Sequence, residues 1–201
     1  MFKWARAALC AYGVVVVGEL GSVLTLAGTF RRDIHRFFDQ LQTAAPGQPP
    51  APNLNGLYPV SIAVDLGQLV LLGVGIVFLV WQYNAARVAR GLGYPARTSP
   101  GFGVASWFIP VINLWFPYWA LSDCLPPNHP LRPSALWAWL AYLATGLLMS
   151  ATFLVAFFSG YAAIIPLVPA LISLAAAVAL GYRLITAVNN DQRGAFQGKP
   201  R

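Results

Sequence analysis

The chain has 201 residues; 58% of them are hydrophobic, only 9% are charged, and the mean hydropathy is +0.61. Because soluble domains carry roughly a quarter charged residues, this composition excludes an ordinary water-soluble domain and is typical of a chain that lies in a lipid bilayer. The formal charge is +7. In a membrane protein an excess of basic residues sets the topology, so we do not expect a nucleic-acid partner.

Four apolar runs are long enough to cross a bilayer, which takes about 20 residues of helix. The predicted spans are residues 7–29, 58–86, 134–158 and 161–188. They indicate an all-α fold, a single membrane domain over residues 1–201 with four transmembrane helices. We find no internal repeat, so the sequence does not indicate an inverted-repeat transporter.

The first run begins after Lys3 and Arg6, as a secretory signal peptide begins after basic residues. The run is longer than the apolar core of a signal peptide, which has about 7–15 residues, and Glu19 interrupts it. We therefore expect a first span that the protein keeps.

Residues 30–41 follow this span and have two different faces. Apolar residues recur at helical spacing, and basic residues and a histidine fill the other side: Ile34, Phe37, Phe38 and Leu41 against Arg31, Arg32, His35 and Arg36. The pattern predicts a short amphipathic helix on the outer membrane surface, with a docking surface for a partner as the alternative. The Pro- and Gly-rich residues 42–57 are predicted to form a flexible extracytoplasmic loop.

An aromatic segment, residues 101–124, lies between spans two and three and is also long enough to cross the bilayer. Pro110 and Pro117 would break a spanning helix, because each proline leaves a backbone carbonyl without its hydrogen bond. We therefore predict two short helical pieces that are interfacial or re-entrant. The four-residue spacing of Trp107, Val111, Trp115 and Trp119 predicts one buried stripe along them.

The distribution of basic residues supports four spans and not five. With four spans, ten of the 13 basic residues are cytoplasmic and the other three, Arg31, Arg32 and Arg36, are outside. The ten are Lys3, Arg6, Arg87, Arg90, Arg97, Arg132, Arg183, Arg193, Lys199 and Arg201. A fifth span would move Arg132 and the basic tail to the outside, against the rule that positive residues stay inside.

A set of motifs occupies the stretch from Trp81 to Asp123. It consists of Trp81, Asn84-Ala85, Leu92-Gly93, Ser99-Pro100-Gly101, Trp107-Phe108-Ile109-Pro110-Val111, Asn113-Leu114, Pro117-Tyr118 and Asp123, with Trp137 and Trp139 further on. This set resembles the domain-of-unknown-function 4328 family, multi-pass membrane proteins common in actinobacteria. The chain departs from the family at Gln82 and Tyr83, where basic residues are usual. The resemblance implies a bacterial integral membrane protein and supplies no activity.

Glu19 and Asp65 are the two carboxylates that we place within the bilayer, at nearly the same depth and just outward of its middle. An ionisable residue at this depth is costly and is a candidate functional group, and Gln68 is a polar neighbour by depth. Two carboxyls that face each other would suit a proton relay or a cation site. The alternatives are carboxyls that only hydrogen-bond to neighbouring helices, and a contact with a partner subunit.

The candidate inner-face motif consists of Trp81, Asn84, Arg97, Trp107, Pro110, Asn113, Pro117 and Asp123. A structural role is favoured for its asparagines, because Asn beside a broken helix satisfies free backbone groups. The alternative is a pocket for a lipid headgroup or a cytoplasmic partner, built by Asn84, Asn113, Asp123 and Arg97. The basic residues of this face would also meet the anionic lipids of the inner leaflet.

The remaining reactive residues do not form a recognisable site. Cys10 and Cys124 lack CxxC spacing and are expected as free thiols, and His35 and His129 fall on opposite sides of the membrane, so they cannot share a metal. Metalloprotease, serine-hydrolase, P-loop and dinucleotide-binding motifs are all missing from the sequence. We expect no metal, no cofactor and no enzymatic activity; a membrane enzyme that uses only carboxylates is the alternative.

The leading hypothesis is therefore a non-enzymatic component of the cell membrane. It would assemble with another membrane or envelope protein, or with further copies of itself, within a bilayer whose inner leaflet is anionic. Both termini are predicted to be cytoplasmic, with residues 189–201 as a frayed tail. The alternative is a small transporter or channel-like protein that uses Glu19 and Asp65.

Overall fold

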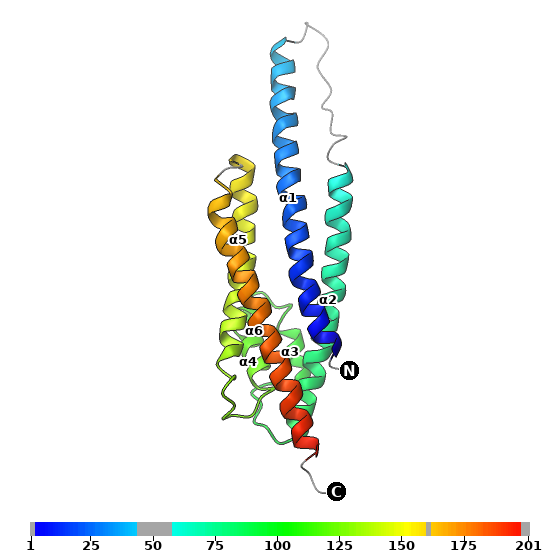
Figure 1. Ribbon diagram of the computed structural model, residues 1–201, viewed down its shortest axis with the longest axis vertical. Helices are drawn as coiled ribbons and strands as arrows, with labels where there is room; N and C mark the ends of the chain where they lie inside the picture. Colours follow the sequence, from blue (N-terminus) through cyan, green and yellow to red (C-terminus); the bar gives the residue numbers. More distant parts are fainter. Residues whose placement is uncertain (1–2, 44–57, 160–161, 198–201) are drawn as a thin grey trace.

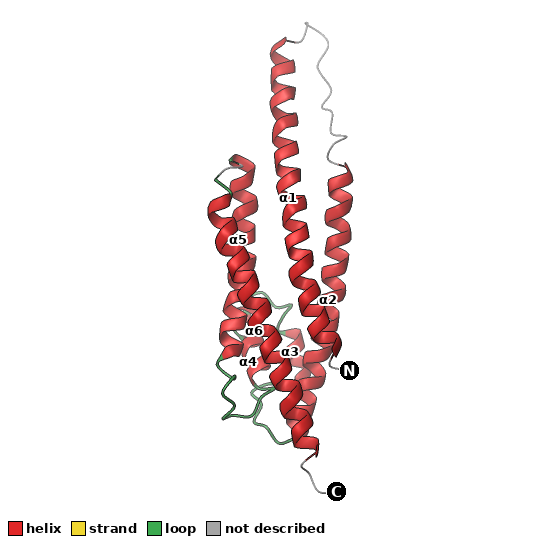
Figure 2. Ribbon diagram, viewed as in Figure 1, coloured by secondary structure: helices red, strands yellow, loops and turns green. Residues whose placement is uncertain are grey.

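Four long helices run side by side, and shorter helices close one side of the bundle (Figure 1). The computed structural model describes residues 3–43, 58–159 and 162–197. The long helices are α1 (Lys3–Thr43), α2 (Tyr58–Gly91), α5 (Ser134–Phe158) and α6 (Ile164–Gln197). The short ones are α3 (Pro100–Ala105), the 3-10 helix η2 (Ile112–Leu114) and α4 (Phe116–Ser122). Figure 2 shows helices joined by loops throughout the described chain.

The four long helices are long and apolar enough to cross a membrane. This confirms the predicted all-α fold with four transmembrane helices, and α5 covers the same residues as the predicted third span. The chain thus has the architecture of a multi-pass membrane protein. Both termini lie toward one end of the bundle, together with the loops around α3 and α4 (Figure 1). We call this end the terminal end.

Helix α1 is much longer than a span requires. Its 41 residues cover about 60 Å, twice the hydrocarbon core of about 30 Å. The prediction of a separate amphipathic helix over residues 30–41 is wrong: the segment is helical but continues α1 without a break and projects past the other long helices (Figure 1). The reason is local, because no proline interrupts the segment and the Arg32 side chain bonds back to the Gly28 carbonyl at 3.3 Å. Most of the predicted loop, residues 44–57, lies outside the described residues.

Helix α2 ends at the glycines that the sequence indicates. The N–H of Gly93 bonds to the Arg90 carbonyl at 2.9 Å, and that of Tyr94 to the Ala89 carbonyl at 3.0 Å. These two bonds form a Schellman motif, which needs a left-handed residue just past the helix, and Gly93 has φ +83°. The motif turns the chain back toward the bundle, so the aromatic segment begins beside α2.

Helix α6 runs further than predicted. The tail was expected to fray from residue 189, but α6 continues to Gln197. Two of its polar residues, Asn189 and Gln192, are buried and hydrogen-bonded to α2 and to the loop after α4, which holds the extra turns in place. Residues 198–201 lie outside the described part of the chain.

The aromatic segment forms short helices and not a fifth span, as predicted. Ser99 caps α3, because its Oγ accepts a hydrogen bond from the backbone N–H of Phe102 at 3.1 Å and Pro100 occupies the first turn. Pro117 lies in the first turn of α4, where a missing N–H breaks no helical bond. Pro110 lies in the turn between α3 and η2. Each proline thus occupies a position that tolerates it.

The predicted stripe along this segment is wrong. Turns separate α3 from α4, so residues four apart do not share one face: Val111 is 65% exposed and Trp115 is 40% exposed. The buried residues lie instead mainly in and just after α4. They are Pro117, Ala120, Leu121, Ser122, Asp123 and Cys124, with Gly103 and Ser106 near α3.

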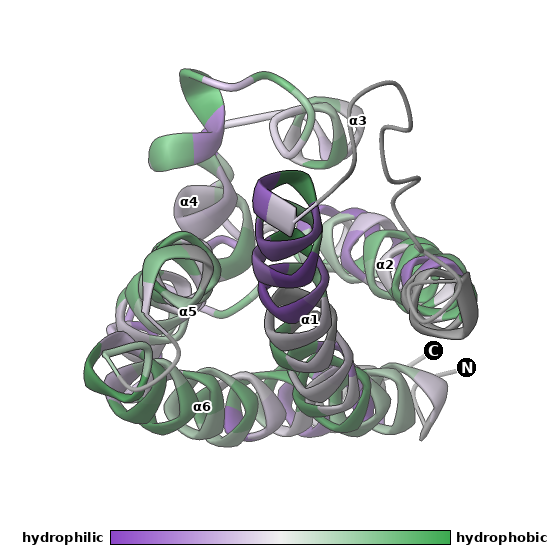
Figure 3. Cartoon of the chain, turned by 90° about the horizontal axis from the view of Figure 1, so that it is seen from above, coloured by the Kyte–Doolittle hydropathy of each residue, from purple (hydrophilic) through white to green (hydrophobic). Residues whose placement is uncertain are grey.

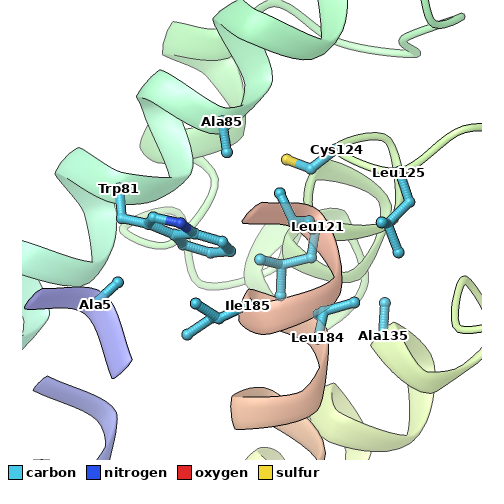
Figure 4. Packing of buried hydrophobic residues seen from close by; sticks show 10 residues of the cluster. Ala5, Trp81, Ala85, Leu121, Cys124, Leu125, Ala135, Leu184 and Ile185 are labelled. Atoms are coloured by element: carbon cyan, nitrogen blue, oxygen red, sulfur yellow. The ribbon is translucent and has the colours of Figure 1, made fainter. Parts of the chain in front are cut away.

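The helices pack as two pairs with a third layer. Helices α1 and α2 form one pair and α5 and α6 the other, and α3 and α4 lie across from α6 between α2 and α5 (Figure 3). The main core lies toward the terminal end and joins all of these layers through Trp81, Leu121, Cys124, Leu184 and their neighbours (Figure 4). Helix α1 approaches α6 closely, since a Cβ on Gly181 would lie 3.0 Å from a Leu9 methyl.

Candidate functional site

The structure brings Glu19 and Gln68 together between α1 and α2. The Gln68 amide Nε2 donates to Glu19 Oε2 at 2.7 Å. The other carboxyl oxygen, Oε1, is buried and has no hydrogen-bond partner among the described residues. Gly67 makes the approach possible, because a Cβ there would clash with the Glu19 side chain. Gln68 is thus a direct neighbour of Glu19, as its depth suggested.

Asp65 does not join this pair. It is exposed, and its described neighbours give it no hydrogen bond or ion pair. The intramembrane site therefore consists of Glu19 and Gln68 in this structure, with Asp65 outside it.

Asp123 is the hub of the inner-face motif. It ends α4 and is only 5% exposed. Its Oδ2 accepts a hydrogen bond from the backbone N–H of Arg97 at 2.8 Å, and its Oδ1 lies 2.9 Å from an Arg132 Nη atom and 3.9 Å from Arg97 Nε. The predicted pair of Asp123 and Arg97 is therefore in contact, and Arg132 completes the cluster. Arg97 also lies over the Trp119 ring, 5.4 Å from its centroid.

Gln82 connects α2 to α3. It is 1% exposed; its Oε1 accepts from Trp107 Nε1 at 2.8 Å and its Nε2 donates to the Gly103 carbonyl at 3.3 Å. Gly103 also lets α3 lie close to α4, because a Cβ at that position would lie 3.1 Å from the Ala120 side chain. In the sequence Gln82 stands out only as a departure from the family pattern, yet it accepts the hydrogen bond of the Trp107 ring N–H.

Helix α6 supplies two further polar residues that the sequence analysis did not single out. Trp81 Nε1 donates to Asn189 Oδ1 at 3.2 Å. Gln192 Nε2 donates to two backbone carbonyls, Ala85 at 3.0 Å and Cys124 at 3.2 Å. The available signal was the three-residue spacing of Asn189 and Gln192, which continues the buried face of Ile185 and Val188.

The other predicted motif residues have smaller roles. Asn84 Nδ2 donates to the carbonyl of Val80, four residues back in the same helix, at 2.8 Å. Asn113 Oδ1 is buried without a partner among the described residues. Pro110 is exposed in its turn. The predicted pocket from Asn84, Asn113, Asp123 and Arg97 does not form as one site, since only Asp123 and Arg97 meet.

Two titratable groups at this end are held in their neutral forms. Burial raises the pKa of the Cys124 thiol to about 12, and the neighbouring Asp123 carboxylate adds to the rise. Burial also raises the pKa of Tyr94 to about 12, helped by the hydrogen bond at 2.7 Å from its hydroxyl to Asp191 Oδ2. Cys124 is therefore a poor nucleophile, because the reactive form is the thiolate.

A small apolar cavity lies beside the hydrogen bonds of Trp81 and Trp107. Its volume is about 70 Å³, and aromatic rings supply much of its wall, including Tyr12, Phe78, Trp107, Trp139 and Tyr142. Trp107 meets Trp139 and Tyr142 edge to face, at centroid distances of 5.0 and 5.8 Å. Among the described residues no three His, Cys, Asp or Glu side chains cluster as a metal site. These hydrogen bonds and ring contacts link α2, α6 and the aromatic segment at this end, and we call them the polar lock.

Replacing Gln82 by leucine tests this lock. Gln82→Leu leaves the Trp107 N–H buried without an acceptor, whereas the Gly103 carbonyl keeps its bond from Ser106. We expect the free energy of unfolding in detergent to fall by about 1–3 kcal/mol, the cost of one unsatisfied buried group. Tryptophan fluorescence during denaturant unfolding measures it. The matched control, Asn84→Leu, removes only a bond within α2 and should cost much less; an equal loss would contradict the role of Gln82.

Comparison with known proteins identifies the family. A family model described as Domain of unknown function (DUF4328) matches residues 59–190, well over half of the chain. No curated protein and no solved structure matches the chain. The matched range contains all of α3, α4 and α5 and every residue of the inner-face motif. The chain therefore belongs to the DUF4328 family, as its motifs predicted.

Proposed function

We propose that this protein is a non-enzymatic component of the cell membrane that assembles with another membrane or envelope protein. The observation that carries the proposal is the projection of α1, residues 31–43, past the other long helices (Figure 1). On this projection Ile34, Phe38 and Leu41 form one apolar row, and they are 37%, 56% and 43% exposed. Apolar side chains in a row on a helix outside the bilayer favour a partner that covers them.

The charge of the projection indicates what kind of partner would fit. It carries Arg31, Arg32 and Arg36 against Asp33 and Asp39, which gives three positive and two negative charges and a net charge of +1. Arg36 pairs with Asp33 at 3.7 Å but remains 74% exposed. The complementary partner is an amphipathic helix with an apolar row flanked by acidic side chains. A second copy of the chain would repeat the positive charge and fits less well.

The orientation that we propose places this projection outside the cell and both termini in the cytoplasm. It rests on the excess of basic residues at the terminal end. The projection is then available to envelope proteins, and the aromatic segment faces the inner leaflet.

Cysteine labelling tests the orientation. In a background with Cys10 and Cys124 replaced by alanine, Gln42→Cys at the tip of α1 should react with a membrane-impermeant maleimide on intact cells. Asn128→Cys, exposed in the loop after α4, should react only after the membrane is opened. The reverse pattern would show that the termini lie outside.

Disruption of the apolar row tests the assembly. We expect the tagged full chain, purified gently from its host, to carry a stoichiometric partner, and Phe38→Asp to lose at least about 90% of it, because a charge in the apolar contact costs more than 1.4 kcal/mol. Gln40→Asp makes the same charge change on the other side of the helix and should keep the partner.

A photoreactive phenylalanine at position 38 identifies what covers the row. A cross-link to an acidic amphipathic helix of that partner supports the proposal. A cross-link to a second copy of the chain, or to lipid alone, contradicts it, as does equal loss in the two aspartate variants.

Transport is the second candidate, and Glu19 is the observation that favours it. An unpartnered carboxyl oxygen inside a span can hold a proton or a cation. In reconstituted vesicles, Glu19→Gln should then abolish pH-dependent flux while the folded yield stays unchanged, because glutamine can still bond to Gln68. Asp65→Asn is the comparison: unchanged flux would place Asp65 outside the pathway. Flux that survives Glu19→Gln would exclude this role of Glu19.

A further inference from the structure

An open hollow of about 440 Å³ lies at the terminal end, between the loop after α2 and the loop after α4, and its walls are Pro95, Ala96, Arg97, Pro127 and Arg132. We propose that Arg97 and Arg132, held beside the carboxylate of Asp123, form a binding site for a phosphate group in this hollow. The proposal is independent of the assembly proposed above, which concerns the opposite end of the molecule.

The two arginines are fixed before any ligand arrives. Arg132 is only 18% exposed and contacts Asp123 Oδ1 at 2.9 Å. Arg97 is held at three points: its backbone N–H bonds to Asp123 Oδ2, its Nε lies 3.9 Å from Oδ1, and its guanidinium lies over the Trp119 ring. A preorganised pair of this kind loses little side-chain entropy when it binds an anion.

Asp123 neutralises only one of the two positive charges and leaves some of the N–H donors of the two arginines unbonded. Two guanidinium groups against one carboxylate leave a net charge of +1 at the cluster. Asp123 takes only one Nη of Arg132, and the Nη groups of Arg97 have no acceptor among the described residues. The fork geometry of guanidinium matches the oxygens of a phosphate, so these free donors select that ligand.

Among the residues that line the hollow, only the two arginines have side-chain hydrogen-bond donors. Pro95 and Pro127 have no backbone N–H, and Ala96 has no polar side chain. An anion in the hollow is therefore recognised by Arg97 and Arg132.

The position of the hollow allows two sources for the phosphate. Arg132 lies two residues before α5, which begins an apolar span at Ser134, so the hollow lies at the level where lipid headgroups meet water. The phosphate of an anionic phospholipid and free phosphate present the same chemistry to the two arginines. The test below separates them.

Native mass spectrometry of the full chain in detergent provides the test. The probes are dioleoylphosphatidylglycerol, dioleoylglycerol, which has the same tails and no phosphate, and inorganic phosphate. We expect the wild-type chain to retain one phosphatidylglycerol, saturably, and not to retain dioleoylglycerol. Arg97→Gln and Arg132→Gln should each weaken this binding about tenfold or more, the effect of losing one charge-assisted contact.

Arg87→Gln is the matched control. Arg87 is exposed at the same end, over the Tyr83 ring, and does not line the hollow, so its loss should leave the affinity unchanged. Competition by inorganic phosphate would identify a soluble phosphate as a ligand, and binding that phosphate does not displace would identify the lipid headgroup.

Two results would overturn the proposal. One is a wild-type chain that binds neither phosphatidylglycerol nor phosphate saturably. The other is an Arg87→Gln chain that loses as much affinity as Arg97→Gln. Should the glutamine variants fail to fold, Arg97→Lys decides, because lysine keeps the charge beside Asp123 but lacks the fork. Its affinity should fall by severalfold, and an unchanged affinity would exclude recognition by the guanidinium.

Discussion

A buried carboxylate that must be fully paired organises the terminal end of this molecule. Asp123 is withdrawn from water at the end of α4, so its charge is tolerated only while Arg97 and Arg132 remain against it. The same requirement extends to the backbone around it. The breaks in the aromatic segment free carbonyl groups, and side chains from three long helices satisfy them: Gln82 bonds to Gly103, Gln192 to Cys124, and Trp139 to Leu114. A broken helix can lie against the spans because they supply these partners.

The number of spans could be predicted from the sequence because it depends on run length and hydropathy alone. The bounds of α5 agree with the prediction to the residue. The continuity of α1 could not be predicted in the same way. The change near residue 30 from an apolar to a two-faced pattern marks a change of surroundings, and the helical period itself continues across it. Composition thus predicts how much of a helix is apolar enough to span, but not where the helix ends.

The candidate site was harder to predict because it depends on how each helix is rotated about its own axis and on contacts between residues distant in sequence. The helical rise of about 1.5 Å per residue places Glu19 and Asp65 at one depth, but it does not say which way each side chain faces. In the structure Gln68, and not Asp65, contacts Glu19. Gln82 lies within an apolar run, and its partner is 25 residues away on a chain that must first turn back. The sequence singled out Arg132 only as one of the basic residues that set the topology. The spacing of Asn189 and Gln192 was readable, since it extends the buried face of α6.

The two ends of the bundle meet different physical demands. Exposed apolar residues along the spans, such as Leu72 on α2 and Leu147 on α5, need no protein partner, because lipid tails cover them at no cost. Exposed apolar side chains on residues 31–43 lack that cover, since α1 has already run about 40 Å from Lys3 by residue 31, more than a bilayer core of about 30 Å. Arg31, Arg32 and Arg36 also keep this part of α1 from sliding into the hydrocarbon. The polar lock at the terminal end joins α2, α6 and the aromatic segment, and α1 packs against this core through Ala5 and Leu9. One end of α1 is therefore fixed on the bundle, while residues 31–43 extend past it.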